Sequence, residues 1–274
     1  MKRNLLKTLT LIGCFSTGII YGSIGVIAIL SFLKLKDGGA DENSFFVLLD
    51  GFVFGRVLNW VIILGAVCFI IWRFYEAFQD PYNIGSDAKA LLLRTGAAFS
   101  SGADAFIAIS ALQAIFGQQK APVNGQPIMQ RSMVAGLLKT DWGRTAVIVT
   151  ALVLLLTALV LAFYGLSKRF TENIKASDFT KGWTYVVHGI AYAGYLSRGV
   201  ILGVIGFFYL KAAIKHNSSY VVNTDKAFDF LGDHMGPVVF ILIAMGTICY
   251  GLYMFVLGVH YDVDAGKKPK RDDS

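Results

Sequence analysis

The chain has 274 residues, of which 55% are hydrophobic and 16% are charged, and its mean hydropathy is +0.59. A water-soluble domain of this size needs more polar surface, so the composition argues against an ordinary soluble protein and favours one embedded in lipid. The net charge of +7 does not predict a nucleic-acid partner, because Lys and Arg lie in short loops and tails rather than on one contiguous basic face.

Six apolar stretches are long enough for membrane-spanning helices, which need roughly 20 mostly apolar residues. In chain order they cover residues 9–33, 57–79, 90–116, 145–167, 184–212 and 237–260. The basic start of the chain is followed by a long apolar run without a small-residue cleavage site, so we interpret 9–33 as a spanning helix rather than a signal peptide. The fold class is therefore all-α and transmembrane.

Three shorter segments mix apolar and polar residues, and each precedes the second helix of a pair. They cover residues 44–49, 133–138 and 226–231. Such a mixture is typical of short helices that lie at the membrane interface. The loops on the side of the two chain ends hold the larger share of Lys and Arg, which predicts that both termini are cytoplasmic. We expect a multi-pass membrane protein.

The apolar stretches contain an internal repeat. Four glycines of the first stretch recur 181 residues later, and one is kept in the middle of the chain: Gly13, Gly18, Gly22 and Gly25; Gly102; Gly194, Gly199, Gly203 and Gly206. The repeat predicts three units at 1–85, 86–178 and 179–274. Two spans per unit return the chain to its starting side, so the units share one orientation around a pseudo-threefold axis.

The glycine spacing indicates where helices approach one another. Glycines four residues apart place bare backbone on one helical face, which favours close helix–helix contacts. The alternative is that these glycines form a hinge or line a cavity.

Two motifs of the last unit resemble a bacterial membrane family, Domain of Unknown Function 1206. They are Gly194-Tyr195-Leu196-Ser197-Arg198-Gly199 and Met245-Gly246-Thr247-Ile248-Cys249-Tyr250-Gly251-Leu252-Tyr253. The resemblance covers almost the whole chain and implies three copies of a two-helix unit in the bacterial cytoplasmic (inner) membrane; it implies no activity. Thr17 and Ser101 stand in the other two units where the family has a basic residue.

Two charged residues, Asp104 and Arg198, fall deep within the predicted spans. A charge there costs roughly 2.5–3.5 kcal/mol on insertion scales, so such residues usually face the protein interior and find a partner. Their positions in the repeat place them at similar depth, and we expect an ion pair between the third and fifth spanning helices. It would act as a structural staple between helices, or as a polar centre for passage of an ion, a proton or an anion.

The remaining polar residues carry weak signals. His188 and His260 would ligate a b-type haem only if their helices brought them together, and interfacial histidines are commoner. His216 and His234 lie near acidic residues without the spacing of a metal site. No phosphate-binding loop or nucleophile motif is present in the sequence. We expect no cofactor, no metal, no disulfide framework and no enzymatic activity.

Three functions stay open at this point. The first is a non-enzymatic accessory or scaffold protein that contacts membrane lipids or another membrane protein. The second is a small channel or transporter built on Asp104 and Arg198. The third, which depends on the two histidines, is a redox or lipid-handling protein.

Overall fold

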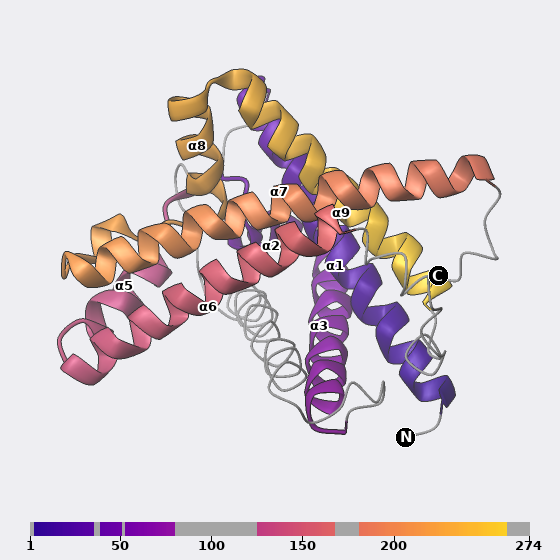
Figure 1. The fold of residues 1–274 in the computed structure, drawn as a ribbon, viewed down its shortest axis with the longest axis horizontal. Helices are drawn as coiled ribbons and strands as arrows, with labels where there is room; N and C mark the ends of the chain where they lie inside the picture. The colour runs from indigo at the N-terminus through magenta and orange to yellow at the C-terminus, as the bar shows by residue number, and fades with distance from the viewer. Residues whose placement is uncertain (1–2, 36–38, 51–52, 80–124, 168–180, 262–274) are drawn as a thin grey trace, which may run out of the picture.

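The computed structural model describes residues 3–35, 39–50, 53–79, 125–167 and 181–261, and the regular elements among them are helices (Figure 1). The long helices are α1 (Arg3–Phe32), α3 (Val53–Gln79), α6 (Asp141–Leu166), α7 (Lys181–Ile214) and α9 (Pro237–His260). The short elements are α2 (Glu42–Asp50), α5 (Ile128–Leu137), the 3-10 turn η4 (Ser218–Tyr220) and α8 (Thr224–Met235). The all-α prediction is confirmed for this part of the chain.

Four of the described helices are long and apolar enough to cross a bilayer. They are the segments Lys7–Phe32, Asp141–Leu166, Gly182–Ile214 and Pro237–His260, which match the first, fourth, fifth and sixth predicted spans. These apolar helices indicate a multi-pass membrane protein. The second predicted span lies in α3, whose qualifying apolar part is the shorter segment Phe54–Cys68. The third, residues 90–116, lies outside the described residues.

The three short helices lie where the mixed segments predicted them, and local capping explains two of the boundaries. Thr140 accepts a hydrogen bond from the backbone N–H of Gly143 at 3.1 Å, which starts α6 directly after α5. Between α8 and α9 the chain turns at Gly236, whose φ of 90° favours glycine. Pro237 then occupies the first turn of α9, where no backbone N–H is required.

The long helices form a continuous series of antiparallel contacts. α3 packs against α1, α1 against α9, α9 against α7, and α7 against α6. In Figure 1, α6 and α7 run side by side across the picture, and the α1–α9 pair crosses them. Segments distant in sequence thus become neighbours, since the first described helix lies against the last.

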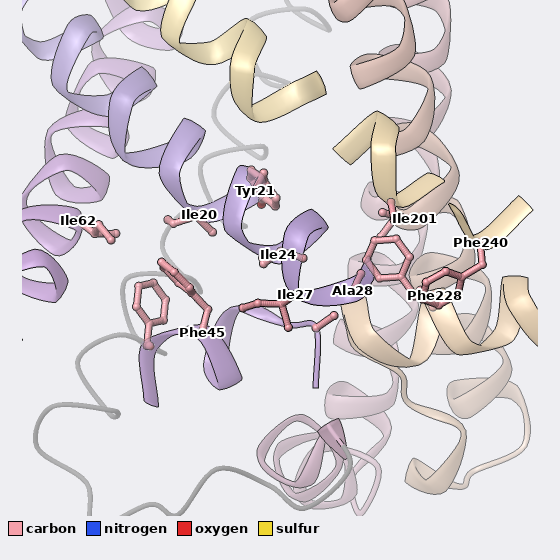
Figure 2. Packing of buried hydrophobic residues seen from close by; sticks show 14 of the residues in the cluster. Ile20, Tyr21, Ile24, Ile27, Ala28, Phe45, Ile62, Ile201, Phe228 and Phe240 are labelled. Atoms are coloured by element: carbon pink, nitrogen blue, oxygen red, sulfur yellow. The ribbon is translucent and has the colours of Figure 1, made fainter. Parts of the chain in front are cut away.

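The largest buried cluster lies where the short helices meet the bundle. Ile20, Ile24 and Ile27 of α1 pack there against Phe45 of α2 (Figure 2). The same cluster continues through Ala28 to residues of α3, α7, α8 and α9. A second cluster joins α7 to α9, and a third joins α5, α6, η4 and the end of α7. The short helices are therefore packed into the bundle as well as linking its long helices.

Candidate functional site

Arg198 lies in the middle of α7 and is 8% exposed. Its guanidinium donates a hydrogen bond to the hydroxyl of Tyr21 on α1. Its Cζ also lies 4.0 Å from the centre of the Tyr21 ring. The buried cation is thus held by two interactions with one tyrosine, a charge-assisted hydrogen bond to its hydroxyl and a cation–π contact with its ring. Arg198 therefore connects α7 with α1.

Tyrosine rings continue from this contact across the bundle. The ring of Tyr250 lies edge-on to Tyr21 at 5.5 Å and to Tyr195 at 5.6 Å between centroids. Tyr195 in turn contacts Tyr164 at 5.0 Å and Tyr253 at 5.4 Å. Edge-to-face pairs of this kind contribute about 0.5–1.5 kcal/mol each beyond area burial. The five rings link α1, α9, α7 and α6 beside Arg198, and we call them the tyrosine cluster.

The predicted partner of Arg198, Asp104, lies outside the described residues, so their ion pair stays a prediction. The contact with Tyr21 was not predicted. Sequence reasoning assigns intramembrane tyrosines to the lipid–water boundary. The available signal was that Tyr21 lies in the middle of an apolar run rather than at its end.

The predicted packing glycines of α1 lie against α9. A Cβ at Gly18 would lie 2.9 Å from the carbonyl oxygen of Gly251, and one at Gly25 would lie 2.8 Å from that of Ala244. In the other direction, a Cβ at Gly251 would lie 2.6 Å from the backbone nitrogen of Gly22. Real Cβ atoms essentially never come this close, so the two backbones approach to a distance that only glycine allows.

The equivalent glycines of α7 lie against α6 in the same pattern. A Cβ at Gly199 would lie 3.0 Å from the carbonyl oxygen of Ala158, and one at Gly206 would lie 3.1 Å from the backbone nitrogen of Leu155. Gly203 faces the methyl group of Ala158 at 3.7 Å. Moving from α1 to α7 adds 181 residues, and moving from α9 to α6 subtracts 93. Under this shift the contact of Gly18 with Gly251 corresponds to that of Gly199 with Ala158. The contact of Gly25 with the backbone nitrogen of Ile248, at 2.9 Å, likewise corresponds to that of Gly206 with Leu155.

The contacts within each hairpin also coincide. A Cβ at Gly65 would lie 1.8 Å from the hydroxyl of Ser16, and one at Gly246 would lie 1.7 Å from the hydroxyl of Ser197. α3 therefore packs on α1 in the way that α9 packs on α7. Of the other predicted packing residues, Gly194 faces the backbone of Tyr250, Gly13 is buried, and Gly102 lies outside the described residues.

The starts of α2 and α8 meet in a buried polar cluster at one end of the bundle. Asn223 caps α8 by accepting from the N–H of Lys226 at 3.1 Å, and Asp41 accepts from the N–H of Ser44 at 3.0 Å. The amide of Asn223 also donates to Asp41 at 2.5 Å and to the carbonyl of Gly125 at 3.0 Å. One side chain thus joins three loops that are far apart in sequence.

Asp225 completes this polar cluster. Its carboxylate accepts a hydrogen bond from the N–H of Ala40 at 2.5 Å, and Lys226 lies 3.4 Å away. Burial raises the pKa of Asp225 to about 6, since the desolvation of the carboxylate outweighs the hydrogen bond and the lysine. Burial also raises the pKa of Asp41. The sequence analysis did not predict this cluster, because its members lie in loops that are far apart in the chain.

In the described part of the chain, no arrangement of side chains indicates metal binding. No group of three or more His, Cys, Asp or Glu side chains converges there. The ring of His260 bonds to the carbonyl of Val256 at 3.2 Å, and that of His234 to the carbonyl of Phe230 at 3.0 Å. Both are contacts within a single helix, and haem ligation by His188 and His260 stays a hypothesis.

Comparison with known proteins identifies the family to which the chain belongs. The model of the family described as Domain of Unknown Function (DUF1206) matches residues 12–80 and 193–260. The chain belongs to this family. The first matched segment covers most of α1 with α2 and α3, and the second covers most of α7 with α8 and α9; the two begin 181 residues apart.

One relative aligns over most of both chains, and its name states no activity. The chain is 25% identical over 252 residues to a protein of Bacillus subtilis (strain 168) named "Uncharacterized protein YxxB", covering 91% of this chain and 89% of the relative. No solved structure matches the chain. The family assignment thus agrees with the predicted resemblance and leaves the function open.

Proposed function

We propose that this DUF1206 protein is a non-enzymatic accessory or scaffold protein of the bacterial inner membrane. Arg198 carries the proposal: among the described residues it is the buried charged side chain within a candidate span, and it joins α7 to α1 through Tyr21. Such a contact stabilises the arrangement of helices, which is what a scaffold requires. Membrane lipids and another membrane protein are the partners that this role implies.

We further propose that six helices form three hairpins of one orientation, with the units 1–85, 86–178 and 179–274. The support is the coincidence of the α1–α9 and α7–α6 contacts under the repeat spacing. In this arrangement the first helix of each unit packs on the second helix of the preceding unit. The ring would be completed by residues 90–116, with Gly102 opposite Ile70.

Disulfide crosslinking tests the arrangement. In a background where Cys14, Cys68 and Cys249 are replaced by serine, the pair Gly102→Cys and Ile70→Cys should crosslink under mild oxidation in native membranes. The control pairs Gly102→Cys with Leu159→Cys, which lies on α6 and is 69% exposed. Crosslinking of the control alone, or of neither pair, would contradict the three-unit ring.

Affinity purification in mild detergent tests the scaffold function. The proposal expects one stoichiometric membrane-protein partner, whose retention survives when Arg198→Lys keeps the cation. Purification without any partner from cells that express the protein at its natural level would count against it.

The second candidate is a channel or transporter that uses Arg198 and Asp104. The observation that favours it is the buried cation beside the tyrosine cluster. Liposome flux separates the two functions. A flux that Asp104→Asn abolishes while the melting temperature stays unchanged would favour transport over the scaffold.

A further inference from the structure

Five basic side chains gather at the end of the bundle where α5 meets α6 and where α7 ends. They are Arg131, Lys139, Arg144, Lys211 and Lys215, and we call this set the basic corner. One buried apolar cluster holds Val134, Val147, Ala212, Ala213 and Val221, with Leu138 and Tyr220 packed against it. Three of the cations contact residues of this cluster, and the other two, Lys139 and Lys215, follow Leu138 and Ala213 by one and two residues. The cluster fixes the three helices relative to one another, so the cations are held together by the fold.

Three of these cations are oriented by contacts that leave their charge uncompensated. Arg144 donates from Nε to the carbonyl of Ala213 at 3.3 Å, and Arg131 donates from Nε to the carbonyl of Val221 at 3.1 Å. The ammonium of Lys211 lies 4.7 Å from the centre of the Tyr220 ring. Backbone carbonyls and a ring orient these side chains without neutralising them.

No carboxylate pairs with any of the five within the described ranges. Two described cations elsewhere do have such partners: Arg56 lies 2.9 Å from Asp50, and Lys226 lies 2.6 Å from Asp229. The nearest acidic residue in sequence, Asp141, is exposed in the first turn of α6. The basic corner therefore carries a local excess of positive charge.

The repeat supplies an internal comparison for Arg144. Gly55-Arg56 and Gly143-Arg144 both begin the second helix of a unit. A Cβ at either glycine would lie 2.0 Å from a carbonyl oxygen of the preceding short helix, that of Leu49 or Leu137. In the first unit Asp50 follows Leu49 and pairs with Arg56, whereas Leu138 follows Leu137. The equivalent arginine thus pairs with a carboxylate in the first unit, whereas in the second unit none of the described carboxylates pairs with it.

The basic corner lies at the ends of two candidate spans. One span begins at Asp141 and the other ends at Ile214. Around it, large apolar side chains are exposed: Trp142 at 87%, Ile128 at 64% and Met133 at 54%. Cations at the end of a span lie at the depth of the lipid phosphates, and apolar side chains exposed next to them face the acyl chains.

We propose that the basic corner binds the phosphate of an anionic phospholipid of the surrounding bilayer, with its acyl chains along the exposed faces of α5 and α6. This inference rests on the membrane location and is independent of the three-unit ring. Each Lys or Arg near an anionic headgroup should strengthen retention about fivefold, equivalent to about 1 kcal/mol. The attraction should weaken with salt, since charges at the surface are screened.

Native mass spectrometry of the full-length protein tests the proposal, with phosphatidylglycerol or phosphatidylcholine added to detergent micelles. The wild type should retain phosphatidylglycerol over phosphatidylcholine by more than tenfold. The double variant Lys139→Gln/Lys215→Gln, which changes two exposed side chains, should lose most of that preference. Equal retention of the two lipids by the wild type, or an unchanged preference in the double variant, would overturn the proposal.

A matched pair of variants separates the basic corner from general charge effects. Arg144→Gln should lower retention of phosphatidylglycerol about fivefold, and Arg56→Gln should leave it unchanged. Equal effects of the two would assign the retention to overall charge and contradict the site. The crosslink between positions 70 and 102 does not depend on these basic residues. If the lipid-binding proposal fails, the test of the three-unit ring is therefore unaffected.

Discussion

Replacing Gly251 by alanine tests the close approach of α1 and α9. The new methyl group would lie 2.6 Å from the backbone nitrogen of Gly22, 2.8 Å from its Cα and 2.7 Å from the carbonyl oxygen of Gly18. All three atoms belong to backbone, so no side chain can rotate away. The helices would have to separate by several tenths of an ångström to restore ordinary contact.

The magnitude follows from two opposing effects. Overpacking in a well-packed interior costs typically about 1–3 kcal/mol. Replacing a helical glycine by alanine returns up to about 1 kcal/mol in helix propensity. We therefore expect Gly251→Ala to destabilise the protein by about 1–2 kcal/mol. Gly22→Ala on the facing helix is the control, because a Cβ there meets nothing within 4 Å; it should be neutral or slightly stabilising.

A thiol-reactive dye can measure both variants, since Cys14 is 1% exposed and becomes reactive when the helices separate. The unfolding midpoint in detergent should fall for Gly251→Ala and stay the same or rise for Gly22→Ala. If the two midpoints moved together, or if Gly251→Ala matched the wild type, the packing of α1 on α9 would be refuted.

Three further outcomes are expected. Gly65→Ala and Gly246→Ala should lower the unfolding midpoint by similar amounts, because each methyl group would overlap the hydroxyl of a serine at the same place in a hairpin; a difference above about 1 kcal/mol would contradict their equivalence. Tyr21→Phe should cost about 1 kcal/mol by removing the acceptor of the Arg198 hydrogen bond, and an unchanged midpoint would show that this bond contributes nothing. The pKa of Asp225 is raised from 3.8 to about 6, so its contribution to stability is full below pH 3.8 and is lost as pH rises through 6. Between about pH 4 and 7 the wild type should lose roughly 3 kcal/mol relative to Asp225→Asn; parallel pH profiles of the two proteins would refute the buried carboxylate.

Much of the fold follows from the sequence, because the membrane imposes few solutions. Backbone groups in lipid must be satisfied within the segment, so long apolar runs predict helices at the right places. The boundaries were less accurate: α1 begins at Arg3 although the apolar run begins at residue 9, and α7 begins at Lys181 rather than 184. Lys and Arg are good helix formers, so a helix continues beyond its apolar part.

The candidate site was predicted only in part. Arg198 stood out because a charge is costly within a span. Its contact with Tyr21 joins residues 177 apart in sequence, and the polar cluster joins Asp41 to Asn223, which are 182 apart. Such pairs are set by which helices become neighbours, and local patterns carry no information on that choice. The glycine faces are an exception, since a repeated contact leaves a repeated spacing that the sequence shows.

The most direct test of the proposed architecture is the sidedness of the two chain ends. A small accessible tag at each end in turn, probed with an impermeant reagent on inverted and right-side-out membrane vesicles, reports which face each end occupies. Three hairpins of one orientation require both ends to label together on the cytoplasmic face. Labelling on opposite faces would mean an odd number of crossings and would contradict the three-unit account.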